Sequence, residues 1–444
     1  MRILKEQGIN GMSLVQHLEK AKLSSLHYKL LVVASLAYLF TAMNTVLIAP
    51  ALDLIAEEFD LDPFRTGLLI SAFYIGMLVG AITCGYLSDK IGRRAVMVLT
   101  LVIHSLFTAL FSFSPNFNVA FIVRLIAGYG AGGLLPLPGV YIAEYSPAKY
   151  RGRFLGIVET SWVFGALLAS GLGLYLIPNF GWRSLFLSGL IPLIIAPVIA
   201  VSPESIRYLE KKGDVGTALK ILEKFKVKPA PEEVKVEKRE EKISISELFS
   251  KEYLSRTIVL WTLWFVLVYT YHGIFIWLKK FFINTGLIPR EQALLFYFIV
   301  TTVQIPGYLT ATLLLDKIGR KPVLIIFLTL SGLGCLGFSA AKDFSSVLIT
   351  SSVISFFNLG AWAGLYAYTP ELYPTRIRGT GSGSAASCGR FGGILQGPIT
   401  GIVVSSAGLF GTFIKFSILH WIAALVVLLL GIETKGRVLE DISK

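Results

Sequence analysis

Three ionisable side chains stand inside apolar stretches of this sequence, and their types suggest chemistry. Arg124, Glu159 and Arg390 each lie inside one of the long, mostly apolar runs of the sequence. A charge held inside a membrane is costly unless it is paired or hydrated, so such residues are functional candidates by default. A guanidinium can bind a carboxylate through two parallel hydrogen bonds, and a buried carboxyl group can gain and lose a proton. The three side chains therefore suit the binding of an organic acid and the movement of a proton.

Charged motifs also recur in the two halves of the chain at one constant displacement. The segment SDKIGRR at 88–94 returns as LDKIGRK at 315–321. The pattern Glu-x-x-Pro-x-x-x-Arg-Gly begins at Glu144 and again at Glu371. Both repeats are displaced by 227 positions. Two motifs with the same displacement indicate that the halves are copies of one another.

The composition predicts that the elements holding these residues lie in a membrane. The chain has 444 residues, of which 54% are hydrophobic and only 16% are charged, whereas soluble domains have about 25% charged residues. This composition excludes a disordered, fibrous or disulfide-stapled protein. The net charge of +13 is spread in short clusters between apolar runs. That pattern is typical of membrane topology signals, so no nucleic-acid partner is expected.

The cysteines and histidines give no support to a metal site. The three cysteines stand in apolar segments, and the five histidines form no closely spaced pair. We therefore expect the cysteines to pack as small hydrophobic residues. No metal and no cofactor are expected.

The apolar residues form runs long enough to cross a bilayer as helices. A spanning helix needs about 20 mostly apolar residues, and a backbone in lipid must satisfy its own hydrogen bonds, which favours helix. We therefore predict an all-α integral membrane protein with twelve transmembrane helices in two six-helix parallel repeats. The predicted helices cover 28–50, 66–87, 95–113, 118–143, 153–177, 183–201, 257–283, 292–314, 322–341, 345–369, 379–404 and 409–431.

One long hydrophilic stretch divides six of these runs from the other six. Because six spans return the chain to the side where it started, both halves enter the membrane in the same direction. The predicted parts are a cytoplasmic N-terminal segment at 1–27, a bundle at 28–201, a cytoplasmic linker at 202–256, a second bundle at 257–431 and a cytoplasmic tail at 432–444.

The distribution of Lys and Arg predicts the orientation of the chain. The turns after even-numbered runs carry basic clusters, such as those within 90–94 and 317–321, whereas the first turn is acidic. The turn after the seventh run, with Lys279, Lys280 and Arg290, is the exception. Under the positive-inside rule, both termini lie in the cytoplasm of a multi-pass protein of the cell membrane.

At these motifs the chain resembles the major facilitator superfamily over essentially its whole length. The segment GYLSDKIGRR at 85–94 matches that superfamily's loop motif between the second and third spans. PESIRYL at 203–209 and ETKG at 433–436 are similar to sugar-porter signatures, although isoleucines stand where prolines are common. RGRFLGIVETSW at 151–162 and the stretch from 368 to 383 resemble niacin, aromatic-acid and synaptic-vesicle-like members, and the latter also organic ion transporters. The resemblance implies the major facilitator fold and transport by alternating access.

The resemblance also implies that the repeated charged motifs form a cytoplasmic gate. In the superfamily such charges pair the inner helix ends of the two halves and separate when the cavity opens inward. The alternative is that they only set topology and anchor the helix ends. The predicted gate residues are Asp89, Arg93, Glu144, Arg151, Glu204 and Arg207 in the first half, and Asp316, Arg320, Glu371, Arg378 and Glu433 in the second.

The superfamily lines its cavity with the first, fourth, seventh and tenth spans, helped by the fifth, eighth and eleventh. Aromatic walls with few polar groups suit a small ring-bearing ligand. The predicted substrate-binding residues on these spans are Asn44, Arg124, Tyr271, His272, Gln304, Asn358, Trp362 and Arg390. Asn44 stands where related symporters often have an aspartate, and this departure weakens the case for strict proton coupling.

Glu159 is the predicted proton carrier. Burial favours the protonated form of a carboxyl group, while a nearby cation favours the ionised form, so alternating contact with a cation could load and unload a proton. The alternative is a carboxylate fixed in a static ion pair. Arg390 is predicted to bind a substrate carboxylate, unless a carboxylate of the protein neutralises it instead.

Together these features predict a secondary active transporter of a small organic metabolite, a carboxylate or aromatic acid, coupled to protons. A sugar or polyol porter is the alternative because of the signatures at 203–209 and 433–436, although the seventh span has no cluster of glutamines for hydroxyl groups. A third reading is a non-transporting receptor with the same fold. No catalytic triad or nucleotide loop suggests an enzyme. The expected partners are a small-molecule substrate, protons and the lipid bilayer, and the chain is expected to be a monomer.

Overall fold

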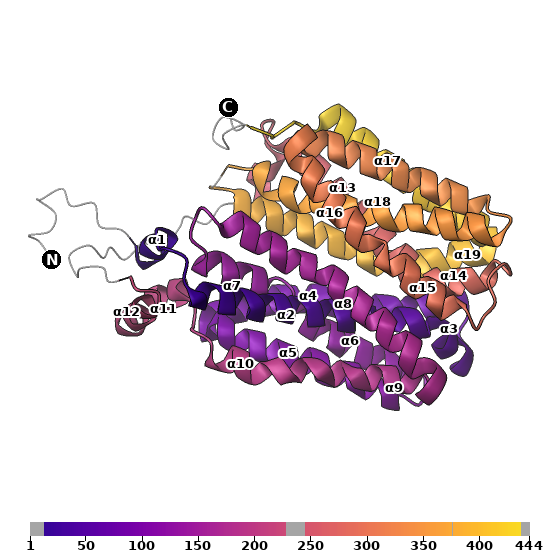
Figure 1. Cartoon of the computed structure of the whole chain (residues 1–444), viewed down its shortest axis with the longest axis horizontal. Coiled ribbons are helices and arrows are strands. Elements are labelled where there is room, and N and C mark those ends of the chain that lie inside the picture. Colours follow the sequence, from indigo (N-terminus) through magenta and orange to yellow (C-terminus); the bar gives the residue numbers. More distant parts are fainter. Residues whose placement is uncertain (1–12, 228–244, 375, 437–444) are drawn as a thin grey trace, which may run out of the picture.

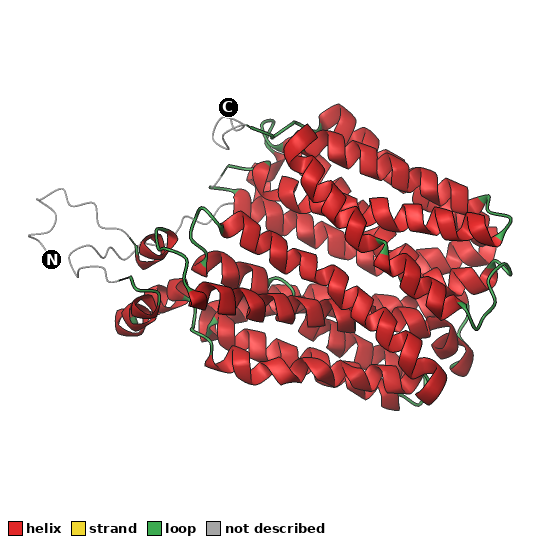
Figure 2. Cartoon of the chain, in the orientation of Figure 1, coloured by secondary structure: helices red, strands yellow, loops and turns green. Residues whose placement is uncertain are grey.

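The computed structural model describes residues 13–227, 245–374 and 376–436, and in these residues it is helical with short connections. Figure 1 shows two helical bundles side by side, one built from the first half of the chain and one from the second. Figure 2 shows that loops are confined mostly to the ends of the helices. The predicted all-α fold is therefore confirmed.

The first bundle is built from long helices, three of which continue in shorter pieces. Asp62 illustrates how they begin, because its carboxylate accepts a hydrogen bond from the backbone nitrogen of Arg65 at 2.7 Å and Pro63 follows it; both are favoured at a helix N-terminus. The helices are α2 (Ser25–Val46), α3 (Ile48–Glu58), α4 (Pro63–Ile91), α5 (Arg93–Leu110), η2 (Phe111–Phe113), α6 (Phe117–Leu134), α7 (Leu137–Tyr145), α8 (Arg151–Phe180), α9 (Trp182–Leu187), η3 (Ser188–Ile195) and α10 (Ala196–Val201).

The second bundle repeats this plan. Its first span breaks between Phe275 and Leu278, as the first span of the other bundle breaks at Leu47. The helices are α13 (Leu254–Phe275), α14 (Leu278–Asn284), α15 (Ala293–Thr302), α16 (Gln304–Ile318), α17 (Arg320–Ser339), α18 (Phe344–Glu371) and α19 (Arg378–Leu430).

The last helix, α19, contains two membrane spans. At 53 residues a straight helix would be about 80 Å long, whereas the bilayer core is about 30 Å thick. Gly408 has φ 62° and ψ −162°, a conformation open only to glycine, and the chain turns back there. With α19 divided at Gly408, the eleven long apolar helices of the described residues give the twelve predicted spans.

The two ends of the bundles differ, and we name them the terminal face and the far face. The terminal face carries the start and end of the described chain together with three short helices, seen at the left of Figure 1. These are α1 (Leu14–Glu19), α11 (Ile206–Lys212) and α12 (Val215–Lys224), and η5 (Ile245–Phe249) leads into α13. The middle of the predicted linker, 228–244, and parts of the predicted terminal segments lie outside the described residues.

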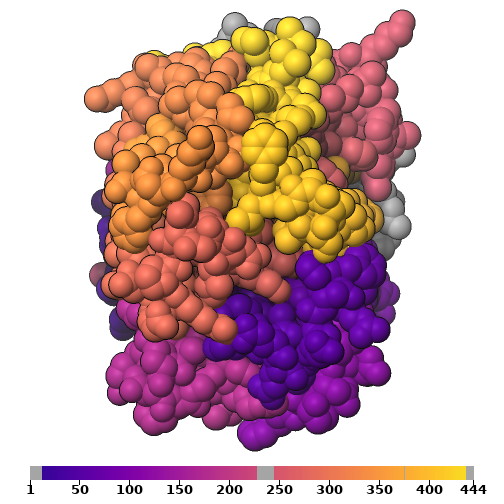
Figure 3. All heavy atoms as spheres, turned by 90° about the vertical axis from the view of Figure 1, so that its right-hand side faces the viewer, coloured from indigo at the N-terminus to yellow at the C-terminus, as the bar shows by residue number. Residues whose placement is uncertain are grey.

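The far face is where the two bundles meet most closely. Here α4 packs against α19, and α3 packs against α14. A side-chain carbon on Gly67 would overlap the carbonyl group of Gly397 in the other bundle, so this approach requires glycine. Figure 3 looks onto the far face and shows the indigo segment of the first bundle in contact with orange and yellow segments of the second.

Candidate substrate site

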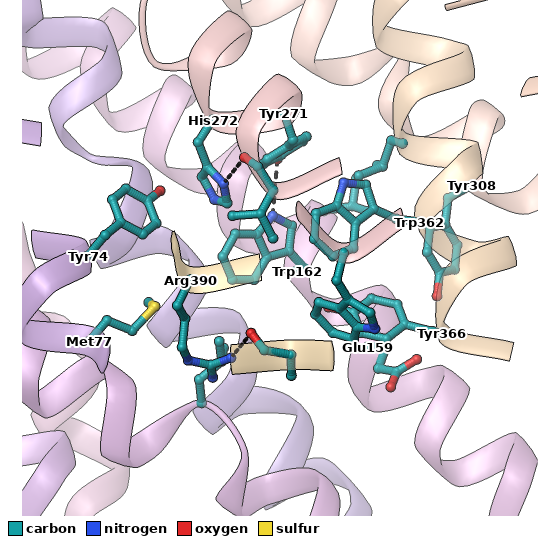
Figure 4. A pocket seen from close by; sticks show the side chains of 16 residues that line it. Tyr74, Met77, Glu159, Trp162, Tyr271, His272, Tyr308, Trp362, Tyr366 and Arg390 are labelled. Carbon is teal, nitrogen blue, oxygen red and sulfur yellow. Dashed lines mark hydrogen bonds between the residues drawn. The ribbon is translucent and has the colours of Figure 1, made fainter. Parts of the chain in front are cut away.

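A cavity lies between the two bundles. Its volume is about 70 Å³, and its walls come from both halves. The first half contributes α4, α8 and Leu135, which lies between α6 and α7, and the second half contributes α13, α16, α18 and α19. The space admits a few water molecules, so a larger ligand must push the walls apart. The labelled lining residues in Figure 4 are Tyr74, Met77, Glu159, Trp162, Tyr271, His272, Tyr308, Trp362, Tyr366 and Arg390.

Arg390 provides a positive charge in this cavity. One nitrogen of its guanidinium, Nη1, donates to the carbonyl oxygen of Ala386 at 2.8 Å, one helical turn earlier on α19. Its Nε finds no hydrogen-bond partner within the described residues. No ion pair in the described part of the chain joins Arg390 to Glu159. The guanidinium therefore retains capacity for an anion from outside the protein.

Glu159 lies in the wall formed by α8, across the cavity from Arg390 (Figure 4). Its carboxyl group is in electrostatic reach of the hydroxyl groups of Tyr38 and Tyr366. These two hydroxyls lie 3.2 Å apart and join α2 of the first bundle to α18 of the second. Arg390 also interacts with both tyrosines. Both tyrosines therefore interact electrostatically with Glu159 and with Arg390.

A second hydrogen bond between the bundles supports the aromatic wall. Trp162 Nε1 on α8 donates to the hydroxyl oxygen of Tyr271 on α13 at 3.0 Å. Tyr271 in turn donates to Gln304 Oε1 at 3.3 Å. Gln304 therefore acts on the cavity through Tyr271, whose ring it orients.

His272 presents an unsatisfied ring nitrogen to the cavity. Its Nδ1 is bonded to the carbonyl oxygen of Val268 at 2.9 Å, while its Nε2 finds no partner among the described residues. The ring packs edge-on against Tyr74 with centroids 5.0 Å apart. The hydroxyl of Tyr74 and Nε1 of Trp362 are also buried there without a partner in the described chain. Since buried polar groups normally have partners, these atoms are available to a ligand or to water in the cavity.

Four of the eight predicted substrate residues line the cavity, namely Tyr271, His272, Trp362 and Arg390. The structure differs from the expected cavity placement for Asn44, Arg124, Gln304 and Asn358, which do not line it. Each of these four side chains is directed into the packing of the helices rather than into the cavity.

The partners of these residues explain the difference. Asn44 Nδ2 donates to the carbonyl oxygen of Gly189 at 3.1 Å within the first bundle. Asn358 Nδ2 is bonded to His420 Nε2 at 2.9 Å within the second. Arg124, with 1% of its surface exposed, stacks over the ring of Phe73 at 4.4 Å. Its three side-chain nitrogens find no hydrogen-bond partner in the described residues.

Several aromatic residues of the cavity were not among the predicted site residues. Trp162 follows Glu159 by three positions and therefore shares its helix face, so a periodicity argument could have found it. Tyr74 and Tyr308 carry no such signal, because they lie on α4 and α16 and reach the cavity only through the packing of the two bundles.

The predicted gate residues of the first half form a cluster on the terminal face. Arg93 and Glu144 form an ion pair. Glu204 accepts hydrogen bonds from the backbone nitrogens of Arg93 at 2.9 Å and Arg94 at 3.2 Å, which are the first residues of α5. A carboxylate at a helix N-terminus satisfies donors that have no partner in the helix. The other contacts are Asp89 with Lys211 at 3.4 Å and Arg151 with Glu19 at 2.5 Å.

The second half repeats this cluster. Arg320 pairs with Glu371 at 2.9 Å and with Asp316 at 3.8 Å. Glu433 accepts from the backbone nitrogens of Arg320 at 3.1 Å and Lys321 at 3.0 Å. The duplication seen in the sequence is therefore also a duplication of contacts. Each of these ion pairs joins two residues of the same half.

A wide vestibule separates the halves on the terminal face. Its volume is about 950 Å³, and Arg207 and Arg378 are among its lining residues, together with Arg93, Glu144 and Arg151. Within the described residues, the ion pairs found in the two gate clusters lie inside each half, and the vestibule lies between the halves. The chain is open on the terminal face and closed on the far face.

Ion pairs between the halves are found on the far face. Lys279 Nζ on α14 lies 2.6 Å from Asp53 Oδ1 on α3, and the two side chains are only 4% and 6% exposed. Lys279 also donates to the carbonyl oxygen of Pro50 at 2.9 Å. Outside this buried pair, Arg290 binds Glu57 at 2.5 Å, and that hydrogen bond raises the pKa of the guanidinium above its usual value. Lys279 and Arg290 were predicted only as an exception to the positive-inside pattern, and their contacts with the acidic first turn were not predicted.

No cluster of three histidine, cysteine or acidic side chains that could hold a metal ion is found in the part of the chain that the structure describes.

Comparison with known proteins finds relatives over almost the entire chain. The family model "Sugar (and other) transporter" matches residues 30–444. The niacin transporter NiaP of Acinetobacter baylyi is 36% identical over 97% of this chain and 100% of the relative. The putative niacin/nicotinamide transporter NiaP of Bacillus subtilis is 33% identical over 93% of this chain and 98% of the relative. A benzoate transport protein of Acinetobacter baylyi is 28% identical over 88% and 86%.

A solved structure supports the fold. The xylose transporter XylE from E. coli, in a partially occluded inward-open conformation, superposes with a TM-score of 0.77 and 20% sequence identity, covering 94% of this chain and 100% of that one.

Proposed function

Since the chain belongs to the sugar (and other) transporter family, we propose that its cargo is a small aromatic carboxylate, carried across the membrane by alternating access together with a proton. The chain is a multi-pass membrane transporter of the major facilitator superfamily and not an enzyme. The proposal concerns its cargo, its coupling and its orientation.

The observation that carries the proposal is Arg390 in a cavity with aromatic walls. Within the described residues, the hydrogen bond found for the Arg390 guanidinium is the one to the carbonyl oxygen of Ala386, so the guanidinium can also donate to a carboxylate. The aromatic rings of Trp162 and Trp362 can pack against a planar ring. Arg124 adds a second buried cation nearby, in electrostatic reach of Tyr74 in the cavity wall. An anionic cargo lowers the cost of burying these positive charges.

The relatives support the same class of cargo. Niacin and benzoate, for which the relatives are named, are both planar rings bearing a carboxylate. A xylose-like sugar is the second candidate, favoured by the family description and by the fold similarity. Against it, a sugar needs many hydrogen bonds, and the residues that line this cavity are aromatic or aliphatic apart from Glu159 and Arg390.

Glu159 is the proposed proton carrier, and its position in the cavity wall supports that role. Protonation of its carboxyl group would remove a negative charge from the cavity when an anionic cargo enters. The cargo and the proton would then cross in the same step, which makes accumulation of the acid depend on the proton gradient.

The orientation and the gates complete the proposal. We place the terminal face in the cytoplasm of the cell membrane, on the positive-inside argument, and treat the chain as a monomer. The charged clusters around Arg93 and Arg320 would then form the cytoplasmic gate when the halves close on that side. In the present state they hold helix ends within each half.

Transport by purified protein in lipid vesicles tests the proposal. We expect uptake of pyridine-3-carboxylate and benzoate that rises when the vesicle interior is more alkaline than the outside, and no competition by xylose. Uptake of labelled xylose with no uptake of either acid would overturn the aromatic-acid cargo in favour of the sugar. Acid uptake that does not depend on the pH gradient would support the aromatic-acid cargo and overturn proton coupling.

A further inference from the structure

We propose that the cavity takes up one proton when it binds an aromatic acid with a basic ring nitrogen, and that His272 is the residue responsible. The proton lies between Nε2 of His272 and the ring nitrogen of the cargo. The inference rests on the proposed function, because it assumes that an aromatic acid binds in this cavity. It adds a residue that distinguishes one aromatic acid from another.

The tautomer of His272 is fixed by its own helix. Its Nδ1 lies 2.9 Å from the carbonyl oxygen of Val268. A carbonyl oxygen can only accept a hydrogen bond, so Nδ1 must carry the hydrogen. In a neutral imidazole the other nitrogen, Nε2, is then a bare acceptor. This acceptor is buried at the cavity, with His272 only 6% exposed, and has no partner among the described residues.

A bare acceptor and a pyridine nitrogen cannot bond to each other. Each carries a lone pair and neither carries a hydrogen, so their close approach is repulsive. One added proton converts the pair into an N–H···N hydrogen bond, whichever nitrogen holds it. In this step neutral His272, the acid anion and one proton taken from water combine to form one complex. A ring without a nitrogen presents no lone pair and needs no proton at this position.

The negative charge of the cargo lowers the free-energy cost of taking up a proton in this buried site. A positive charge alone in the cavity would be disfavoured by desolvation. The carboxylate of the same cargo places a negative charge in the cavity that offsets the charge of this proton. Arg390 can hold the carboxylate while His272 meets the ring, because the two residues reach the same cavity from α19 and α13 (Figure 4).

The other titratable groups around His272 come from several helices. Two tyrosines pack against its ring, Tyr74 on α4 and Tyr271 on α13, both at 5.0 Å between centroids. The ring of Trp162 on α8, which does not titrate, lies at 6.2 Å. The remaining titratable groups of the cavity are Glu159 on α8, Tyr308 on α16, Tyr366 on α18 and Arg390 on α19. Of these only Glu159 is an alternative place for a proton, and it would respond to any acid, with or without a ring nitrogen. Comparing two acids therefore separates the two sites.

Calorimetry of ligand binding tests the inference. Purified full-length protein is titrated at neutral pH with pyridine-3-carboxylate and, separately, with benzoate, each in two buffers of different ionisation enthalpy. The change of the binding enthalpy with the buffer gives the number of protons taken up. We expect an additional proton for pyridine-3-carboxylate over benzoate in the unmodified protein.

Two variants and a control make the test specific. In His272→Gln a neutral side-chain amide can donate directly to the ring nitrogen, so the difference in proton uptake should vanish while pyridine-3-carboxylate still binds. In His272→Phe the affinity for pyridine-3-carboxylate should fall relative to that for benzoate. His104→Gln is the matched control, since His104 is also fully buried with Nδ1 bonded to a carbonyl oxygen, that of Ala127, but lies outside the cavity. It should keep the difference.

The outcomes separate the two proposals. Equal proton uptake for both acids in the unmodified protein, or a difference that persists in His272→Gln, overturns the role of His272 and leaves the aromatic-acid cargo standing. Binding of neither acid overturns the proposed function itself.

Discussion

At the scale of single residues, the cavity combines an arginine and a carboxyl group that do not pair with each other. Arg390 is bonded to its own helix, and Glu159 stands in a group of tyrosine hydroxyls on the opposite wall. A direct ion pair would neutralise both side chains and leave neither available. Their separation lets one respond to the carboxylate of the cargo and the other to a proton, so each can be tested by its own substitution.

Replacing Arg390 should weaken aromatic acids selectively. Arg390→Lys keeps the charge but loses the two-pronged geometry, so we expect a loss of about 1.5–3 kcal/mol in acid binding, or roughly 10- to 150-fold in Kd. Nicotinamide, which lacks the carboxylate, should be affected much less. Binding is measured by calorimetry or by ligand-induced thermal shift. Equal losses for the acid and for the neutral amide would contradict a carboxylate contact.

Replacing Glu159 should separate exchange from accumulation. Glu159→Gln is nearly the same size but cannot carry a proton, so loaded vesicles should still exchange labelled for unlabelled acid. Accumulation driven by a pH gradient should be lost. Both fluxes are measured in the same vesicle preparation. If the variant accumulates acid as the unmodified protein does, the proton is carried elsewhere.

Which residues reach the cavity could be predicted only in part from the sequence. Arg390 and Glu159 were identifiable because a charge in an apolar run is rare and needs a reason. Asn44 and Asn358 were misplaced because a polar residue on a spanning helix can equally serve packing, as their bonds to Gly189 and His420 show. Tyr74 was missed because its place depends on how two bundles pack, which no single helix encodes.

At the scale of helices, a glycine and a glutamate together fix the start of α5, and a second such pair fixes the start of α17. Gly92 has φ 96° and Gly319 has φ 99°, values that other residues rarely adopt. A side-chain carbon at Gly92 would also collide with the carboxylate of Glu204, and one at Gly319 would collide with that of Glu433. The glycine is therefore required both for the turn and for the approach of the carboxylate to the helix N-terminus.

A substitution at Gly92 should destabilise the first bundle. Gly92→Ala forces an unfavourable backbone conformation and displaces Glu204, so we expect a loss of about 1–3 kcal/mol, measured as a lower thermal unfolding midpoint in detergent. Gly152 provides the control, because it lies in the first turn of α8 with open space around it. Gly152→Ala should leave the midpoint unchanged or raise it slightly. A Gly92→Ala midpoint equal to that of the control would show that the turn tolerates a side chain.

The helices themselves were largely predictable, because length and hydropathy suffice to identify a span. The exceptions are breaks within spans. The first predicted run ended at 50, whereas the helical path continues through α3 to Glu58, and the breaks at Leu47 and Ile276 were not expected. Residues on both sides of these breaks are apolar, so hydropathy carries no signal of them. Their effect is to direct α3 and α14 toward each other.

At the scale of the whole molecule, the ion pairs described above are distributed asymmetrically. On the terminal face they lie within each half, as in Arg93 with Glu144, and a wide vestibule separates the halves. On the far face the buried pair of Lys279 and Asp53 joins one half to the other. Opening on the far face must break this pair, whereas the terminal clusters can stay intact when that side opens. The far-face pair therefore biases the molecule toward the state seen here.

Neutralising Asp53 should shift this bias. Removing one partner of a buried ion pair leaves the other charge unpaired, at a cost of about 3–5 kcal/mol in the closed state, so we expect Asp53→Asn to raise the population open on the far face by at least roughly 10-fold. Spin labels at two exposed far-face positions, Arg65 and Lys342, report the distance between the halves, which should gain a longer component.

Glu58→Gln is the matched control, because Glu58 is a far-face acid paired within its own half, and its distance distribution should not change. The double variant Asp53→Asn with Lys279→Met removes the unpaired charge as well and should return the distribution toward that of the unmodified protein. If Asp53→Asn leaves the distances unchanged, the glycine-lined contact of α4 with α19 holds the far face closed without help from the ion pair.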